Sequence, residues 1–119
     1  MKFVATEAGF KKGLGGASNS KSAEKYHYVL FGVQKDCQHP ENTGIYFEFD
    51  DQRNGGINSI KAVVLSNKAV AFKLKGGKSI EIDCNVSAQE WNEFKRGIHA
   101  VFPKNTISSK TRSRDSEGN

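Results

Sequence analysis

One amphipathic segment, residues 87–103, limits what this chain can fold into. It begins with Ser87-Ala88-Gln89-Glu90, the pattern of a capping box, in which the serine hydroxyl accepts a hydrogen bond from the amide three residues on and the glutamate reaches back to the serine amide. Pro103 ends a run in which large apolar residues recur at spacings of three and four: Trp91, Phe94, Ile98, Val101 and Phe102. The segment predicts a helix over residues 88–102 whose apolar stripe covers a sheet.

Most of the remaining apolar residues follow the alternation of β-strands. Residues 26–33 are apolar on both faces, which predicts a central strand. Residues 45–50 alternate, with Ile45, Phe47 and Phe49 directed inward. Further strands are predicted at 3–6, 60–65, 70–75 and 80–86. We expect an α+β fold, in which an antiparallel meander of about six strands carries the one C-terminal helix on one face.

The size of the chain allows one domain. With 119 residues, 36% of them apolar, it is long enough for one core and too short for two. We expect residues 1–103 to form this domain, with a flexible loop at 11–25, where glycine, serine and lysine dominate. Residues 104–119 are polar and lack periodicity, which predicts a disordered basic tail.

The net charge of +5 lies at the two ends of the chain. Residues 1–25 carry five lysines against two glutamates, and residues 104–119 carry four basic against two acidic residues, whereas residues 26–103 carry nine of each. Nonspecific nucleic-acid binding scales with the number of phosphates neutralised. The neutral middle therefore argues against nucleic acid as a partner of the folded part.

Cysteine usage and hydropathy predict the compartment. Cys37 and Cys84 belong to no metal-binding or redox motif, so we expect two free thiols. The first residues lack the continuous apolar run of a signal peptide, and no run approaches the ~20 apolar residues that span a bilayer. We expect a cytoplasmic protein that makes no membrane contact.

The segment FEFDDQRNGG, residues 47–56, concentrates polar side chains between a strand and two glycines. A calcium site is one interpretation, because Asp50, Gln52 and Asn54 match the first three ligand positions of an EF-hand loop and Gly55 matches its turn glycine. Lys61, however, occupies the place of the final glutamate, and the flanking segments are strands where that motif has helices. We therefore expect no metal ion and no other cofactor.

Adjacent carboxylates also suggest acid–base catalysis. On a strand, however, Asp50 and Asp51 project to opposite faces. The histidines His27, His39 and His99 fall in three different predicted elements. We expect neither enzymatic activity nor a small-molecule substrate, and a metal-dependent or hydrolytic enzyme centred on the two aspartates is the weaker alternative.

A structural interpretation of the segment is a bulged turn. Asn54-Gly55-Gly56 would supply positive-φ geometry, while Asp51 and Gln52 bond the free amides of the turn. A loop stiffened by its own hydrogen bonds is also a well-organised surface for a partner. The sequence leaves both roles open.

The outward residues of the preceding strand are a second open question. Tyr46, Glu48 and Asp50 would form an acidic stripe with Glu81 and Asp83 if the two strands are neighbours, and an ordinary solvated face if they are not. Strand order decides between these two.

Two stretches, residues 45–60 and 87–102, resemble the immunity protein 10 family of bacterial polymorphic toxin systems. The family segment has the form aromatic-x-E-x-D-D-Q-x-N-G-G, and a terminal helix ending in an apolar-Phe pair closes its domain. The residues that match the segment are Glu48, Asp50, Asp51, Gln52, Asn54, Gly55, Gly56 and Asn58. The resemblance covers residues 45–102 well and the N-terminal third loosely, and neither the 11–25 loop nor the basic tail matches the family.

The resemblance implies a protein that binds and neutralises a cognate toxin by stoichiometric, non-enzymatic occlusion. Acidic side chains suit a basic, nuclease-type toxin, because they mimic substrate phosphates and speed encounter. Two of the segment's residues, Gly55 and Gly56, are expected to form a structural turn. The expected partner-binding residues are Tyr46, Glu48, Asp50, Asp51, Gln52, Arg53, Asn54 and Asn58.

An alternative function is a nucleic-acid-associated module. It would use the basic ends of the chain together with exposed aromatic residues, here Tyr26, Tyr28 and Tyr46. A steep dependence of affinity on salt would distinguish it from a toxin-binding module.

Overall fold

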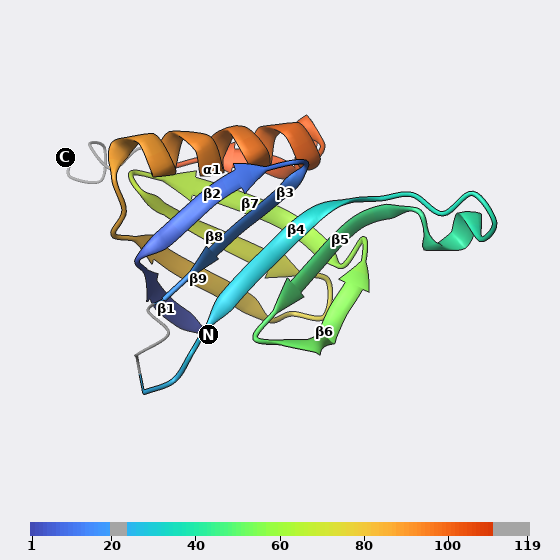
Figure 1. The fold of residues 1–119 in the computed structure, drawn as a ribbon, viewed down its shortest axis with the longest axis horizontal. Coiled ribbons are helices and arrows are strands. Elements are labelled where there is room, and N and C mark those ends of the chain that lie inside the picture. The colour runs from blue at the N-terminus through green and yellow to red at the C-terminus, as the bar shows by residue number, and fades with distance from the viewer. Residues whose placement is uncertain (20–23, 111–119) are drawn as a thin grey trace.

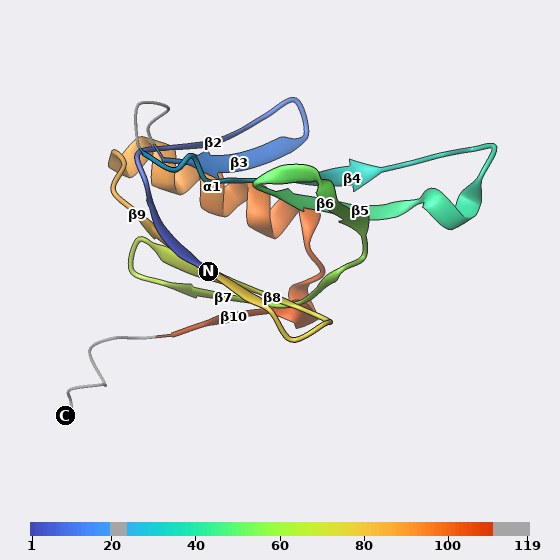
Figure 2. The ribbon, with the colours of Figure 1, turned by 90° about the horizontal axis from the view of Figure 1, so that it is seen from below.

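Two five-stranded sheets form two layers, as Figure 2 shows from the side. The structure, a computed structural model, describes residues 1–19 and 24–110. In spatial order, sheet A contains β1 (Lys2–Ala5), β9 (Ser79–Cys84), β8 (Ala69–Leu74), β7 (Ile60–Ser66) and β10 (Ile107–Ser109). Sheet B contains β2 (Glu7–Lys11), β3 (Leu14–Ser18), β4 (Tyr28–Gln34), β5 (Gly44–Phe49) and β6 (Asp51–Ile57). The helix α1 (Ala88–Val101) and the short 3-10 helices η1 (Pro40–Asn42) and η2 (Lys104–Thr106) complete the described part.

The α+β class is confirmed, and the single sheet of about six strands is wrong. The chain changes sheet at Thr6, between β1 and β2, and again at Asn58, between β6 and β7. Sheet B is a complete antiparallel meander, with β4 at its centre as its two apolar faces predict. Sheet A holds a β7–β8–β9 meander flanked by two parallel pairs, β1 with β9 and β10 with β7.

The helix is as its sequence predicts. The Glu90 amide donates to Ser87 Oγ at 3.1 Å and the Ser87 amide to Glu90 Oε1 at 3.3 Å, which completes the capping box. The helix lies between the sheets, beneath β2 and β3 (Figure 2). Gly97 permits this close approach, because a Cβ there would lie 2.5 Å from the Phe10 ring.

Phenylalanine rings from both sheets and the helix fill the core. The Phe31 ring of sheet B lies 5.9 Å from Phe72 of sheet A, 5.8 Å from Phe94 of α1 and 5.2 Å from Phe102. Phe47 lies 4.9 Å from Phe72. These side chains are almost completely buried, so the predicted apolar faces of the strands and the helix meet in one core.

The expected loop at 11–25 is largely a hairpin. β2 and β3 pair across Lys12 and Gly13, which both have positive φ, as a two-residue hairpin turn requires. β3 has the sequence LGGAS, and its glycines hid the strand, since glycine disfavours strands. Residues 20–23 of this loop lie outside the described residues.

The expected tail at 104–119 begins as ordered structure. After Pro103 the chain forms η2 and then β10, where Ile107 packs against the core opposite Val63 of β7. Three residues of strand with one apolar side chain are too short a pattern to be recognised in the sequence. Residues 111–119 lie outside the described residues.

The two cysteines are free thiols, as expected, in contrasting environments. Cys37 is exposed and Cys84 is buried in β9. Burial raises the pKa of the Cys84 thiol to about 12. None of the helices in residues 1–19 and 24–110 is long and apolar enough to cross a membrane.

A thiol-specific reagent at neutral pH is therefore expected to modify Cys37 and to spare Cys84 in the folded protein. The thiolate is the reactive form, and burial both disfavours it and blocks access. Mass spectrometry of the native protein should show one adduct, and the same reaction in denaturant should show two. Two adducts at equal rates under native conditions would contradict the buried position of Cys84.

Candidate functional site

The candidate site lies where β5 turns into β6 at the edge of sheet B (Figure 1). One residue, Asp50, separates the two strands, and its φ of 62° allows this abrupt reversal. The segment expected to be a loop is thus mostly the edge strand β6. The expected position of the turn is wrong, because positive φ occurs at Asp50 and Asn58 and at neither Gly55 nor Gly56. The expected bulge is present, as a shift in the β5–β6 register between Phe47 and Phe49.

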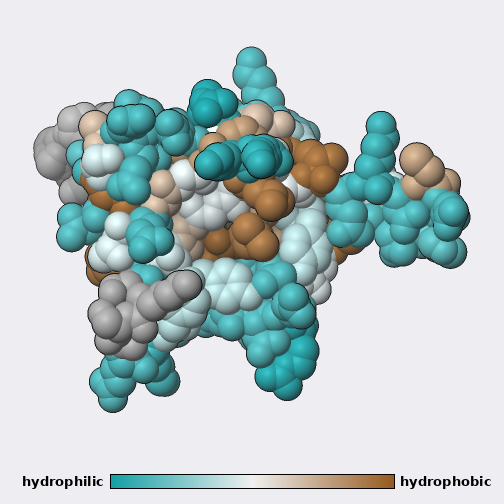
Figure 3. Space-filling model, in the orientation of Figure 1, coloured by the Kyte–Doolittle hydropathy of each residue, from teal (hydrophilic) through white to brown (hydrophobic). Residues whose placement is uncertain are grey.

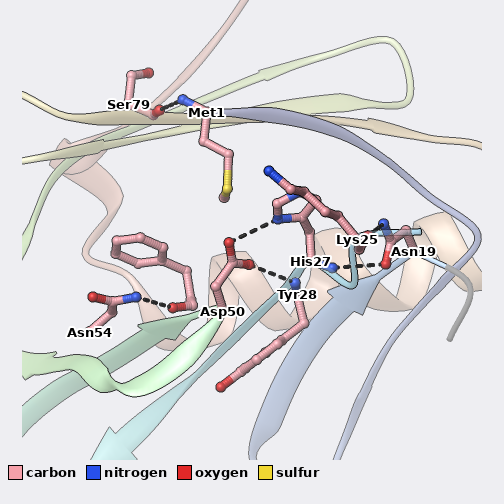
Figure 4. Close-up of polar contacts among 9 residues, drawn as sticks. Met1, Asn19, Lys25, His27, Tyr28, Asp50, Asn54 and Ser79 are labelled. Carbon is pink, nitrogen blue, oxygen red and sulfur yellow. Dashed lines mark hydrogen bonds and ion pairs between the residues drawn. The ribbon is translucent and has the colours of Figure 1, made fainter. Parts of the chain in front are cut away.

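Asp50 joins this corner to the start of β4. Its Oδ1 accepts from the Tyr28 amide at 3.1 Å, and its Oδ2 lies 2.8 Å from His27 Nδ1 (Figure 4). The His27 ring stacks on Phe3 of β1 at 5.5 Å, which connects the corner to sheet A. Asp50 therefore bonds within the protein, contrary to the expectation of an outward partner-binding carboxylate.

Glu48 is the largest departure from the expected site. It lies on the outer face of sheet B, as its alternation predicts, yet only 7% of its surface is exposed. The Tyr28 hydroxyl donates to one carboxylate oxygen, and the Tyr46 hydroxyl donates to the other at 2.6 Å. Two tyrosines thus cover this carboxylate and satisfy both its oxygens.

This arrangement changes the acidity of the two tyrosines. Burial, followed by the hydrogen bond to Glu48, raises the pKa of Tyr28, and the hydrogen bond to Glu48 is the first cause of the raised pKa of Tyr46. Deprotonation of either hydroxyl would remove a donor and place a phenolate beside a carboxylate.

Replacement of Glu48 by glutamine is expected to lower the tyrosine pKa values unequally. The pKa of Tyr46 should fall further toward its ordinary value than that of Tyr28, because the hydrogen bond to Glu48 is the first cause for Tyr46 and burial is the first cause for Tyr28. Alkaline titration of tyrosinate absorbance in wild type, Glu48→Gln and Glu48→Gln/Tyr46→Phe would separate the two groups. Identical titration curves for wild type and Glu48→Gln would rule out the Tyr28–Glu48–Tyr46 arrangement.

The same shifts link stability to alkaline pH. The folded protein holds both pKa values above the ordinary 10.0, so the unfolded chain releases these protons first. The stability they contribute is complete below about pH 10 and is lost as pH rises through the folded pKa values.

Internal hydrogen bonds also hold the remaining polar residues of the segment. Asp51 accepts from the Arg53 backbone amide at 2.9 Å and from its Nε and Nη2 at 3.1 and 3.0 Å. The Arg53 guanidinium holds the pKa of Asp51 below its usual range. Asn54 Nδ2 donates to the Phe49 carbonyl at 2.9 Å, and Asn58 Oδ1 accepts from the Ile45 amide at 2.9 Å.

The part of the candidate site that remains exposed to solvent is the outer edge of β6. Gln52 and Asn54 are exposed, and the Arg53 side chain is 88% exposed. Among the described residues β6 pairs only with β5, so its other edge carries unpaired backbone groups. Strand order settles the open question of an acidic stripe: none forms, because Glu81 and Asp83 lie on β9 of sheet A.

Two members of the site, His27 and Tyr28, are not among the residues expected from the sequence to bind a partner. Tyr28 was detectable in principle, since it and Glu48 face outward on strands predicted as neighbours. His27 had no such signal, because its partner Asp50 depends on the reversal of the chain at that residue.

The carboxylates are engaged by tyrosine, histidine, arginine or backbone donors, and within the described residues no three His, Cys, Asp or Glu side chains gather as metal ligands. Comparison of the chain with family models, with curated proteins and with solved structures found no match.

Proposed function

We propose that this chain is an immunity protein, which binds a cognate bacterial toxin and neutralises it by stoichiometric occlusion, without catalysis of its own. The resemblance of residues 45–60 and 87–102 to the immunity protein 10 family suggests this role. The proposed location is the cytoplasm of the cell that makes the toxin.

The unpaired edge of β6 carries the proposal. An extended segment of a partner can add to such an edge through backbone hydrogen bonds, and alternate side chains then supply specificity. The edge belongs to a corner that is stiffened by hydrogen bonds between backbone groups and four side chains. Asp50, Asp51 and Asn58 accept these bonds, and Asn54 donates one. A stiff corner loses little conformational entropy on binding, which favours affinity.

Asp51 suits a basic partner. It is the most exposed of the three carboxylates at the corner, with 43% of its side chain accessible, whereas Glu48 is buried and Asp50 pairs with His27. Cations also lie nearby, Arg53 against Asp51 and Lys78 over the Phe49 ring, so attraction of a positively charged toxin would be local to Asp51. A standard interface of about 800 Å² per partner, centred on β6, would be enough to cover a toxin active site.

Co-expression with the product of the adjacent gene tests the function directly. The toxin should be harmless in the presence of this protein, and an equimolar complex should survive gel filtration. Continued lethality with no complex would overturn the proposal.

The surface can be located with two matched charge reversals. Asp51→Lys on β6 is expected to weaken toxin binding at least about tenfold, or ~1.4 kcal/mol. Asp83→Lys on the outer face of sheet A changes the net charge equally and is expected to leave the affinity within about twofold. Calorimetric titration of both folded variants is the measurement. An equal loss in both variants would mean that only total charge matters, and a loss in Asp83→Lys alone would move the interface to sheet A.

One observation favours the nucleic-acid alternative. Tyr26 is 43% exposed and stacks on Tyr28 at 5.9 Å, which offers a ring to a nucleic-acid base. If single-stranded nucleic acid is the partner, Tyr26→Ala should weaken binding, and affinity should fall steeply with salt. Toxin binding requires neither result.

A further inference from the structure

A pocket of about 330 Å³ opens between the two sheets, beyond the C-terminal end of α1. Four separate parts of the chain meet there: the start of β5, the β6–β7 connection with the start of β7, the turn after β8, and the segment from Phe102 to Thr106. The volume is at the lower end of the range of small-molecule sites, about 300–1,000 Å³.

The pocket exists because one helix cannot fill the whole space between two five-stranded sheets. α1 lies beneath β2 and β3, at one side of that space (Figure 2). On the β5 side the apolar part of the pocket lining is formed by Ile45, Ile60, Phe102 and Pro103. Ile45 and Ile60 are only partly buried although they pack on the core, so apolar surface remains uncovered.

The polar residues around this apolar floor are cationic or neutral. Lys61 and Lys75 line the pocket, together with Asn58 and Thr106, and none of the eight lining residues is acidic. In the described part of the chain neither lysine takes part in an ion pair. The Lys75 amide donates to the Ser59 carbonyl at 2.9 Å, which fixes the backbone of the β8–β9 turn beside the β6–β7 connection.

We propose that this pocket binds a small carboxylic acid with an apolar body. The body occupies the space between Ile45, Ile60 and Phe102, and the carboxylate lies at the mouth, where the ammonium groups of Lys61 and Lys75 pair with it. Asn58 has its Oδ1 engaged by the Ile45 amide, which leaves its Nδ2 as a further donor among the lining residues. The pocket shares Asn58 with the corner that carries the proposed toxin-binding edge of β6, but its lysines and apolar residues lie outside that edge.

A series of three ligands tests the chemistry. 4-Phenylbutanoate, 4-phenylbutanol and 4-phenylbutylamine share one apolar body and differ in the charge of the head group. The carboxylate is expected to bind about tenfold more tightly than the alcohol, and the amine should bind most weakly. Titration followed by amide chemical shifts should place the largest changes at Ile45, Ile60 and Thr106.

Two matched double variants test the lysines. Lys61→Gln/Lys75→Gln is expected to weaken 4-phenylbutanoate binding about tenfold, to the level of the alcohol. Lys11→Gln/Lys73→Gln removes two exposed lysines from outside the pocket and should leave the affinity unchanged.

Three outcomes would overturn the inference. The first is equal affinity for the three ligands, which would mean apolar adsorption only. The second is a set of shift changes outside the pocket. The third is unchanged binding of 4-phenylbutanoate by Lys61→Gln/Lys75→Gln together with a lower stability of that variant. The two lysines would then only stabilise the C-terminal end of α1 and would take no part in ligand binding.

Discussion

Replacement of Phe31 by alanine is expected to lower the free energy of unfolding by about 4 kcal/mol. Phe31 has no exposed surface, and its ring contacts the rings of Phe72, Phe94 and Phe102, which come from sheet A, from α1 and from the residue that follows it. Its removal leaves a cavity where both sheets and the helix meet, and well-packed rings on all sides limit the collapse of that cavity.

Urea unfolding followed by circular dichroism measures this effect. Phe49→Ala is the matched control, since Phe49 is partly buried at the rim of the same core and should cost about half as much or less. Equal losses for the two variants would show that Phe31 does not join the two layers. A partly folded Phe31→Ala protein would still support its role if near-ultraviolet signals are lost first.

Replacement of Gly15 by valine is the second large expected effect, a loss of about 3 kcal/mol or more. A Cβ at Gly15 would overlap the Phe31 ring, and the buried ring has no space to move into. The glycine is therefore needed on the inner face of β3 for the aromatic core to form.

Gly9→Val is a close control for Gly15→Val. Gly9 lies on the neighbouring strand β2, and a Cβ there would meet no atom within 4 Å. This variant should be neutral or slightly stabilising, because a β-branched residue favours a strand more than glycine does. Destabilisation of similar size in both variants would mean that backbone flexibility, and not the Phe31 contact, explains the effect.

The two substitutions should also compensate each other. In Gly15→Val/Phe31→Ala the valine methyl groups occupy space that the ring has vacated, so the loss should be smaller than the sum of the single losses by about 1–3 kcal/mol. A strictly additive double variant would argue that Gly15 and Phe31 do not touch.

Local signals in the sequence were sufficient for the elements with strong patterns. The capping box at Ser87 and the stripe from Trp91 to Val101 correctly predict α1 within one residue at its C-terminal end. Strong alternation correctly predicts β5, and two apolar faces correctly predict the central place of β4. These properties depend on residues close together in the chain, which the sequence displays directly.

Weak patterns concealed β3, β6 and β10. Gly15 of β3 leaves room for the Phe31 ring, sixteen positions further along the chain, and β6 is a polar edge strand rich in turn-forming residues. Intrinsic propensity disfavours both as strands, and pairing with β4 and β5 overrides it. Only contacts between distant segments supply that energy.

Some features of the candidate site could likewise be predicted from the sequence, and others depend on tertiary contacts. Residue types alone indicated a polar segment suited to recognition, with Gln52, Arg53 and Asn54 now found exposed on β6. The pairing of Glu48 with Tyr28 was detectable from their outward positions on strands predicted as neighbours, whereas the bonds of Asp50 to His27 and Tyr28 depend on the chain reversal at Asp50 and were not.

The sequence by itself determined the helix, the strongest strands and the inward face of each, because hydrophobic periodicity is a property of neighbouring residues. The tertiary structure alone decided that the strands divide into two sheets and that the carboxylates of the β5–β6 corner bond to partners within the protein. The physical reason is that sheet membership and hydrogen-bond partners depend on where the chain turns. Asn58, in the left-handed conformation, lies where the chain passes from sheet B to sheet A, and Asp50, also left-handed, reverses β5 into β6.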